Sequence, residues 1–309
     1  MAKKSVPQIW IEYAVAKAIL VVLGGLPRRA AVAIGVSIAR LGYLLFGKLR
    51  RVGLRNLELA FPEKTPMERE QILRKAFREL GRTLGVVSGF GRLEQANLSD
   101  LVEYEPDAEF DAQFTRARRE KRGLIVLTAH VGNWEMFALA YSILFGPSSL
   151  LSRRMDNPLI DRMVKKTRTR FGNKQIDKVN SAAPILRILR DGGTVGILAD
   201  VNSHPKEGVF VPFFGISACT TAGVAMLALR ANALIVPMFA VWNEEKSRYT
   251  IVNQKIIEPV NTGERKKDIV ETTALYTAEI EKIIRAYPDQ WIWIHRRWKT
   301  RPPGEAGIY

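Results

Sequence analysis

Cysteine and histidine are scarce in this chain, which contains one cysteine and three histidines among its 309 residues. The lone Cys219 excludes an internal disulfide and any zinc or iron–sulfur site built on several cysteines. His130, His204 and His295 are far apart in the sequence, and none has a metal-ligand spacing such as that of an HExxH helix. The sequence therefore predicts no metal centre.

Acidic residues are also in deficit, with 31 Asp and Glu against 47 Lys and Arg and a net charge of +16. An excess of this size predicts an anionic partner, which could be a nucleic acid, a membrane surface, or an acidic carrier or substrate. The sequence disfavours nucleic acid because it has no zinc finger, aromatic RNA-binding motif or basic zipper. Its 47% of hydrophobic residues suffice for a sizeable core and exclude a disordered or collagen-like chain.

Two long apolar stretches near the N-terminus are each interrupted by charges. Residues 9–26 read IWIEYAVAKAILVVLGGL, and residues 30–46 read AAVAIGVSIARLGYLLF. The first could cross a membrane if Lys17 snorkels, because a spanning helix needs about 20 predominantly apolar residues. Alternatively, both helices lie in the membrane interface with Trp and Tyr at headgroup depth, or both are buried in a soluble core. No small-residue cleavage site follows them, which disfavours a secretory signal peptide.

Cations flank both apolar stretches and favour the membrane interpretations. Each Lys or Arg near an anionic lipid surface contributes roughly 1 kcal/mol to binding. We therefore expect residues 1–61 to form membrane-anchoring helices, and we expect anionic membrane lipid to be a partner. The flanking cations are Lys3, Lys4, Arg28, Arg29, Lys48, Arg50, Arg51 and Arg55.

The rest of the chain alternates between helical and strand patterns, with a capped amphipathic helix predicted first, within 62–95. Alternation of this kind predicts the α/β class, here with a mixed, mostly parallel central sheet flanked by helices and preceded by N-terminal membrane-associated helices. We place a catalytic domain at 62–300 and a flexible tail at 301–309. Apolar runs predict strands at 123–130, 148–153, 194–200, 233–242 and 249–257, the last at a sheet edge. The accompanying helices are predicted at 134–145, 157–170, 183–190, 221–230 and 268–287.

The segment HVGNWE (130–135) follows the first predicted strand and is the strongest candidate for chemistry. In an open α/β sheet, ligands bind at the carboxyl ends of the strands. Glu135 could accept the Nδ1 proton of His130 and leave Nε2 to deprotonate a substrate hydroxyl. No serine or cysteine of a nucleophile elbow accompanies the histidine, so we expect the substrate hydroxyl to be the nucleophile. Asn133 in the same segment is a candidate substrate contact.

Several further stretches accompany this segment in a fixed order. They are RNLELAFP (55–62), SRRMDNPLID (152–161), LAD (198–200), PFFG (212–215) with TAG (221–223), and PDQWIWIHRRWK (288–299). Together they make the chain resemble the bacterial lipid A biosynthesis acyltransferase family, the lauroyl- and myristoyl-type enzymes of the lysophospholipid-acyltransferase-like group. The family's H-x4-D/E pair falls on His130 and Glu135, and Asp200 is the alternative partner for the histidine. The family often shows Asp-Gln where this chain has Asp200-Val201.

The resemblance implies a glycerol-3-phosphate-acyltransferase-like fold and a single-step acyl transfer without a covalent acyl-enzyme, metal or cofactor. The donor would be an acyl thioester of acyl carrier protein or CoA, and the acceptor a hydroxyl of a lipid A precursor or related glycolipid. It also implies a location on the cytoplasmic face of the bacterial inner membrane. The alternatives are another acceptor (a phospholipid, an ornithine-type lipid or a mannoside lipid) and a catalytically silent, basic membrane-binding module.

Five residues outside HVGNWE are candidate substrate contacts. Arg154 carries a fork suited to phosphate, with Asn157 nearby, although surface arginines are common on a basic protein. Phe213 and Phe214 are expected on a loop that lines the acyl channel or enters the membrane, unless they pack in the core. Thr221 is expected to open a helix whose N–H groups meet an oxyanion or phosphate, or simply to cap that helix.

Two cationic segments each allow two interpretations. The basic run at 165–170 is either a solvated helix face or a docking surface for acyl carrier protein or lipid headgroups. The Trp- and Arg-rich segment at 291–298 is either an interfacial strand or a segment packed against the sheet, and we do not expect His295 to be catalytic.

Overall fold

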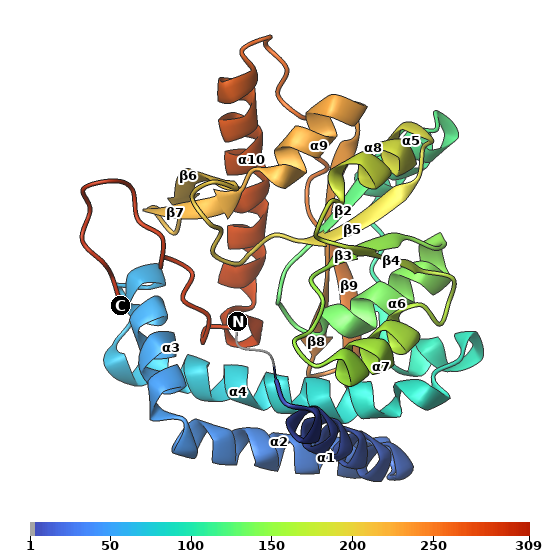
Figure 1. Ribbon diagram of the computed structural model, residues 1–309, viewed down its shortest axis with the longest axis vertical. Helices are drawn as coiled ribbons and strands as arrows, with labels where there is room; N and C mark the ends of the chain where they lie inside the picture. Colours follow the sequence, from blue (N-terminus) through green and yellow to red (C-terminus); the bar gives the residue numbers. More distant parts are fainter. Residues whose placement is uncertain (1–3) are drawn as a thin grey trace.

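The computed structural model describes residues 4–309, so the expectation about Lys3 lies outside the described residues. Four helices come first, and strands alternate with helices after them (Figure 1). The helices are α1 (Val6–Gly25), α2 (Arg28–Leu45), α3 (Gly47–Ala60), α4 (Pro66–Ser88), η1 (Gly89–Arg92), η2 (Gln95–Asp100), α5 (Ala108–Arg119), α6 (Trp134–Phe145), α7 (Pro158–Arg168), α8 (Ala182–Arg190), α9 (Gly223–Ala231), α10 (Arg265–Ala286) and η3 (Pro288–Gln290). The strands are β1 (Val102–Tyr104), β2 (Leu124–Thr128), β3 (Ser149–Ser152), β4 (Lys174–Asp177), β5 (Thr194–Leu198), β6 (Gly208–Phe213), β7 (Ile216–Thr221), β8 (Leu234–Asn243) and β9 (Arg248–Asn253).

Seven strands form the central sheet in the order β1-β9-β8-β2-β5-β3-β4. Neighbouring strands pair in parallel except β8 and β9, which are antiparallel, and β6 and β7 form a separate antiparallel hairpin. The predicted α/β class with a mixed, mostly parallel sheet is therefore confirmed. β2 lies at the centre of the sheet, between β5 and β8, so a residue that follows it sits at the middle of the sheet's carboxyl edge.

Helices cover both faces of this sheet (Figure 1). Ile125 and Leu127 belong to a core cluster that includes residues of α8, α9 and α10, whereas Leu124 and Val126 belong to a second cluster with residues of α5 and α6. Successive side chains of a strand point to opposite faces, which explains this division. Burial on both faces also explains why β2 reads as a continuous apolar run rather than an alternating one.

The helices α2 and α4 run side by side at close range below the sheet (Figure 1). A Cβ built on Gly35 of α2 would lie 2.3 Å from the carbonyl oxygen of Gly81 on α4, so glycine is required for this approach. The close contact fixes α2 to the body of the molecule.

α4 begins with the predicted cap, which is a capping box. The Thr65 hydroxyl and the Glu68 carboxylate each accept a hydrogen bond from the other residue's backbone N–H.

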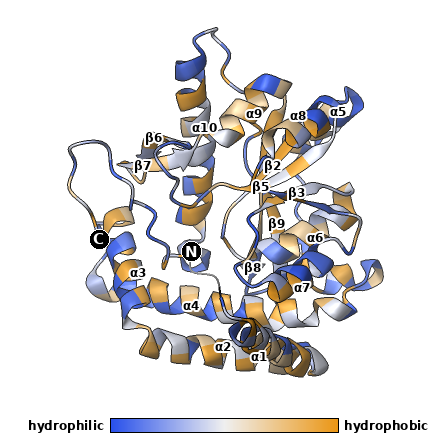
Figure 2. Ribbon diagram, in the orientation of Figure 1, coloured by the Kyte–Doolittle hydropathy of each residue, from blue (hydrophilic) through white to orange (hydrophobic). Residues whose placement is uncertain are grey.

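α1 is mainly apolar (Figure 2) and exposed along most of its length, although Glu12 and Lys17 interrupt its apolar surface. By length and composition it is suited to cross a membrane, while α2 and α3 reach that criterion only as one pair bent by 89°. The outer side of α2 is apolar as well. The exposed apolar residues of the two helices are Val6, Trp10, Ile11, Val15, Ile19, Val21 and Val22 on α1, and Ile34, Ile38, Leu41, Leu44 and Leu45 on α2. The boundary at residue 61 stays a prediction; Asn56 of α3 donates hydrogen bonds across it to the carbonyl oxygens of Trp293 and His295.

Three expectations about individual elements are wrong. β9 does not lie at a sheet edge, because the short strand β1 pairs with its outer side. The loop expected around Phe213 and Phe214 is the turn of the β6–β7 hairpin, where Phe214 has a φ of 53°. Thr221 does not open a helix: it is the last residue of β7, paired with Gly208, and α9 begins at Gly223.

Candidate active site

His130 lies just beyond the carboxyl end of the central strand β2, in a loop that two other parts of the chain hold in place. The Gly132 N–H donates to Gln290 O at 2.9 Å, and the Ile292 N–H donates to His130 O at 3.2 Å. Gly132 has a φ of 57°, and a Cβ there would lie 2.0 Å from Ala240 O. Glycine is therefore required at the turn that directs the chain from His130 into α6.

The carboxylate of Asp200 holds the imidazole of His130. Asp200 follows β5, is 1% exposed, and accepts three hydrogen bonds at its two oxygens. Oδ1 accepts from His130 Nδ1 at 2.9 Å, while Oδ2 accepts from the His130 backbone N–H at 3.0 Å and from Trp291 Nε1 at 2.8 Å. An ionised carboxylate only accepts, so the proton of the neutral imidazole is on Nδ1 and the lone pair is on Nε2.

His130 and Asp200 each stabilise the charged form of the other. Burial raises the pKa of Asp200, but the attraction of His130 and the hydrogen bonds from His130 and Trp291 outweigh burial and lower it to about 2. Burial lowers the pKa of His130, but the Asp200 carboxylate outweighs burial, and the net pKa is raised above the ordinary value of 6.5. Asp200 is thus ionised at neutral pH, and it stabilises the protonated form of His130.

Glu135 does not contact the His130 ring, so the expectation that it orients the imidazole is wrong. Both of its carboxylate oxygens accept from Arg168 at the end of α7, including a 2.9 Å bond from Nε. The ring of Trp134 packs edge-on against His130 instead, with ring centroids 4.9 Å apart. Glu135 lies in the first turn of α6, which directs its side chain toward α7 rather than toward the end of β2.

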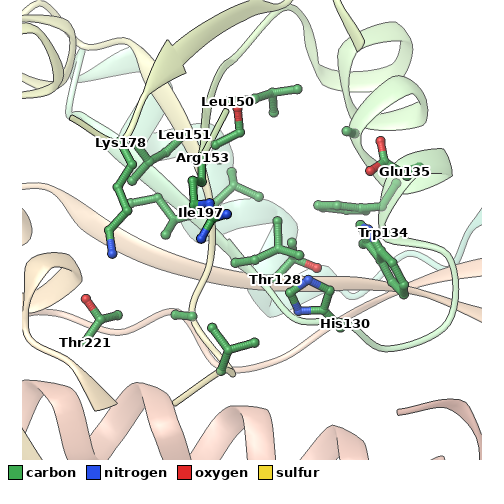
Figure 3. A pocket seen from close by; sticks show the side chains of 18 of the residues that line it. Thr128, His130, Trp134, Glu135, Leu150, Leu151, Arg153, Lys178, Ile197 and Thr221 are labelled. Carbon is green, nitrogen blue, oxygen red and sulfur yellow. The ribbon is translucent and has the colours of Figure 1, made fainter. Parts of the chain in front are cut away.

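A cavity of about 640 Å³ opens beside His130, within the range of roughly 300–1,000 Å³ usual for ligand sites. Its walls are mainly apolar and come from β2, β3, β5 and α6, whereas cationic residues border it elsewhere. Figure 3 shows His130 and Trp134 on one side of the cavity and Arg153 and Lys178 across from them. The imidazole of His130 thus faces a space with apolar walls and cations at its border.

A family model of bacterial lipid A biosynthesis acyltransferases matches residues 2–300. The chain belongs to the bacterial lipid A biosynthesis acyltransferase family. It is 28% identical to the lipid A biosynthesis lauroyltransferase of Escherichia coli K12 over 307 aligned residues. The alignment covers 98% of this chain and 96% of that protein. The lipid A biosynthesis palmitoleoyltransferase of the same organism is 27% identical, and the alignment covers 89% of this chain and 87% of that protein. The lipid A biosynthesis myristoyltransferase is 25% identical, and the alignment covers 88% of this chain and 83% of that protein. The resemblance inferred from the motifs is confirmed, and this chain is an enzyme of the acyltransferase class.

Of the remaining predicted contacts of this acyltransferase, Thr221 lines the cavity. Asn133 is fully buried, and its Oδ1 caps α6 by accepting from the Met136 N–H at 2.9 Å, so it is not placed to contact a substrate. Asn157 caps α7 in the same way and donates its Nδ2 to Ile9 O and to Glu12, which ties α1 to α7.

Arg154 and the two phenylalanines also lie outside the cavity lining. The Arg154 side chain is 78% exposed and pairs with Asp177 at 2.5 Å, while its neighbour Arg153 borders the cavity. Phe213 and Phe214 are buried against the rings of Trp291 and Trp293, so they pack in the core and neither line the cavity nor meet the membrane. The segment at 291–298 is likewise packed against the sheet.

Two residues of the site were not predicted from the sequence in their actual roles. For the segment with Trp291 we expected either an interfacial strand or packing against the sheet, whereas the Trp291 indole N–H also donates to Asp200. Arg168 was grouped with a basic run, whereas it pairs with Glu135 beside the cavity. No local pattern distinguishes Arg168 from the other cations of its run, because its partial burial and its acidic partner become visible only when α6 and α7 pack together.

Proposed function

We propose that this acyltransferase moves a fatty acyl chain from an acyl thioester, carried by acyl carrier protein or CoA, to a hydroxyl of a lipid A precursor or related glycolipid. The observation that carries this proposal is the His130–Asp200 pair beside a largely apolar cavity. Relatives named as lauroyl-, palmitoleoyl- and myristoyltransferases of lipid A biosynthesis support the substrate class.

In the proposed reaction, His130 Nε2 accepts the proton of the acceptor hydroxyl while the hydroxyl oxygen attacks the thioester carbonyl carbon. A C–O bond forms and the carbonyl oxygen becomes an oxyanion. When this tetrahedral species collapses, the C–S bond breaks and the imidazolium returns the proton to the departing thiolate. Asp200 stabilises the transient imidazolium, and a general base of this kind typically contributes about 10²–10⁴-fold to the rate.

The acyl chain is proposed to occupy the space between the sheet and α6. Val126 of β2 lines this space four residues before His130, or about 13 Å along a strand. Gly196 of β5 pairs with Val126 and lines the same region, with Tyr141 of α6 also in the wall. A side chain is absent at Gly196, so the depth available to the chain end depends on this position.

The polar heads of the two substrates are proposed to meet the cations at the cavity border. Arg153 pairs with Asp156 at 2.7 Å and Lys178 with Glu207 at 2.8 Å, and both ion pairs are largely exposed. Such exposed pairs contribute little to stability and exchange readily for a phosphate. A phosphate of the phosphopantetheine arm or of the lipid acceptor would provide that charge.

The apolar helices support a location at a membrane. We propose that α1 anchors the enzyme to the cytoplasmic face of the bacterial inner membrane, where carrier-bound acyl donors are available. The exposed apolar residues of α1 and α2 and the net charge of +16 both favour contact with an anionic bilayer.

His130→Ala tests the proposed function. The purified variant should transfer acyl groups about 10²–10⁴-fold more slowly, because Nε2 is lost, while its circular dichroism and membrane association stay unchanged. Offering acyl carrier protein and CoA thioesters in parallel identifies the donor. Mass spectrometry of lipids from a deletion strain should show which lipid lacks one acyl chain. Turnover near normal in His130→Ala would contradict the mechanism, and wild-type protein inactive with every donor and acceptor would instead indicate a silent membrane-binding module.

A further inference from the structure

A second cavity lies at the elbow between α1 and α2, on a different part of the molecule from the catalytic cavity. Its volume is about 500 Å³, and no described residue lines both cavities. The walls come from the α1–α2 elbow, from the end of α4 with η1 and η2, and from the start of β9. Leu23 and Ala31 supply apolar surface on the helical side.

Three arginines converge on this elbow cavity from separate parts of the chain. Arg28 begins α2, Arg92 ends η1 and Arg248 begins β9. Each guanidinium is held in place by a backbone carbonyl oxygen, and among the described residues none has a carboxylate within ion-pair distance, although Glu103 interacts with Arg248 at longer range. The anchoring bonds are Arg28 Nη1 to Asp100 O at 2.7 Å, Arg92 Nη2 to Leu26 O at 2.8 Å, and Arg248 Nη1 to Ser99 O at 3.1 Å.

The charge of the cavity is unbalanced. Against three arginines its lining contains one acidic residue, Asp100, whose carbonyl rather than carboxylate contacts Arg28. Each guanidinium uses only some of its N–H groups to bond the backbone carbonyl oxygens, so its other N–H groups can donate to an anion. Guanidinium forks match phosphate oxygens in geometry and charge, so a phosphate is the ligand that suits this lining.

The elbow is continuous with the apolar surfaces of α1 and α2. Val21 and Val22 precede it on α1, and Ile34 and Ile38 follow it on α2, all with exposed side chains. If α1 spans the bilayer, its last residues reach the membrane surface; if α1 lies flat, the elbow stays in the interface. In both arrangements the elbow would place the three arginines that line its cavity near the lipid headgroups.

We propose that the elbow cavity binds the phosphate headgroup of an anionic membrane phospholipid, which is neither acyl donor nor acceptor. The three arginines hold the phosphate, while Leu23 and Ala31 contact the upper part of the lipid chains. This site orients the enzyme on the bilayer through a specific lipid contact in addition to the insertion of α1. The proposal goes beyond acyl transfer and does not depend on it.

Native mass spectrometry of the full-length protein released from detergent micelles tests the site, with phosphatidylglycerol and phosphatidylcholine as the lipid probes. The wild type should retain phosphatidylglycerol and not phosphatidylcholine. The double variant Arg92→Gln/Arg248→Gln should bind phosphatidylglycerol about tenfold more weakly or worse, because two charge-assisted contacts are lost. The matched control is Arg119→Gln/Arg187→Gln, which removes the same charge from two exposed helical positions outside both cavities and should bind like wild type.

Additional arms separate the alternatives. Arg248→Gln alone leaves the Arg28 and Arg92 contacts of the elbow intact, so weaker binding by this variant with an unchanged melting temperature supports the site even if the double variant is unstable. Water-soluble glycerol phosphate should not displace the lipid, and displacement by it would overturn the lipid assignment. Equal binding by the double variant and its control, or equal retention of the two lipids, would overturn the proposal. His130→Ala should bind phosphatidylglycerol normally, so a failure of the catalytic mechanism and a failure of this site are distinguishable.

Discussion

Asp200 acts on His130 through hydrogen bonds that converge on one buried carboxylate. An asparagine there would present a donor to groups that are themselves donors, the imidazole Nδ1–H and the Trp291 N–H. The imidazole would then turn its lone pair to the amide and its proton to the cavity, so it could no longer act as a base. Glu135 does not determine the tautomer of His130, because its carboxylate pairs with Arg168.

The acidic limb of the pH–rate profile should separate the two carboxylates. A general base must be neutral, so kcat/KM should rise with pH through the pKa of His130, with a midpoint above 6.5. Asp200→Asn removes the charge that raises this pKa, and burial alone then moves the midpoint of the residual activity below that of wild type. In Glu135→Gln, a carboxylate that raises this pKa is lost while the Arg168 guanidinium still lowers it, so the midpoint should also fall, but by less than in Asp200→Asn, because the Asp200 contributions are the larger ones.

Steady-state kinetics of both variants from about pH 5 to 9, a window centred near the histidine pKa, provides the measurement. An acidic limb that moves further in Glu135→Gln than in Asp200→Asn would contradict the assignment of Asp200 as the partner of His130.

Gly196 should set the length of the acyl chain that the enzyme accepts. A Cβ at this position would lie 3.0 Å from Leu150 Cδ2, a flexible side-chain atom that can yield, so Gly196→Val should fold and fill the far part of the cavity. We expect the preferred donor to become shorter, with loss of about tenfold or more in kcat/KM for the longest chain that wild type uses. Competition between donors of different length measures this preference. A uniform loss for all chain lengths would show that Gly196 does not bound the chain.

At the scale of secondary structure, the contact between α2 and α4 depends on glycine. A Cβ on Gly81 would lie 2.5 Å from Gly35 O and 2.6 Å from Val36 Cα, which are backbone atoms that cannot move without separating the helices. Gly81→Ala should therefore lower the free energy of unfolding by roughly 1–3 kcal/mol. Gly42→Ala is the matched control, because its new Cβ meets only the Phe46 ring at 3.6 Å. Helix propensity should make the control neutral or up to about 1 kcal/mol more stable, and thermal or denaturant unfolding of both variants compares them.

The elements that the sequence predicts well are those whose pattern depends on burial on a helix or strand face. The central strands and α4, α8 and α10 follow from apolar runs and helical spacing, and α4 also from its N-terminal cap. The β6–β7 hairpin could not be predicted, because Phe213 and Phe214 read equally as a loop until their packing against Trp291 and Trp293 is known. For the same reason the choice between Glu135 and Asp200 stayed open: it depends on β2 and β5 lying side by side, which no local pattern specifies.

At the scale of the whole molecule, the apolar helices and the catalytic cavity are physically connected. Asn157, which caps α7, donates to Ile9 O and Glu12 of α1, and the other end of α7 carries Arg168 at the cavity border. Met155, just before this cap, also borders the cavity and is exposed. This border of the cavity is therefore linked to α1 through α7, and under the proposed membrane attachment of α1 a lipid acceptor would approach the cavity from the bilayer surface.

Membrane attachment should accordingly resist salt. At 1 M salt the screening length falls to about 3 Å, so an attachment made only by the +16 charge would be released, whereas buried apolar helices hold until detergent is added. Full-length protein should therefore stay in the membrane fraction after a 1 M NaCl wash.

A variant that lacks residues 1–25 separates the contributions of α1 and α2. The deletion removes α1 and keeps α2, because removing α2 as well would uncover α4. We expect salt to extract this variant, because the outer face of α2 and the arginines bind the membrane only weakly. Fractionation and immunoblotting compare the full-length protein with the deletion variant. Release of the full-length protein by salt alone would rule out α1 as an apolar anchor, and salt resistance of the deletion variant would assign the anchor to α2 instead.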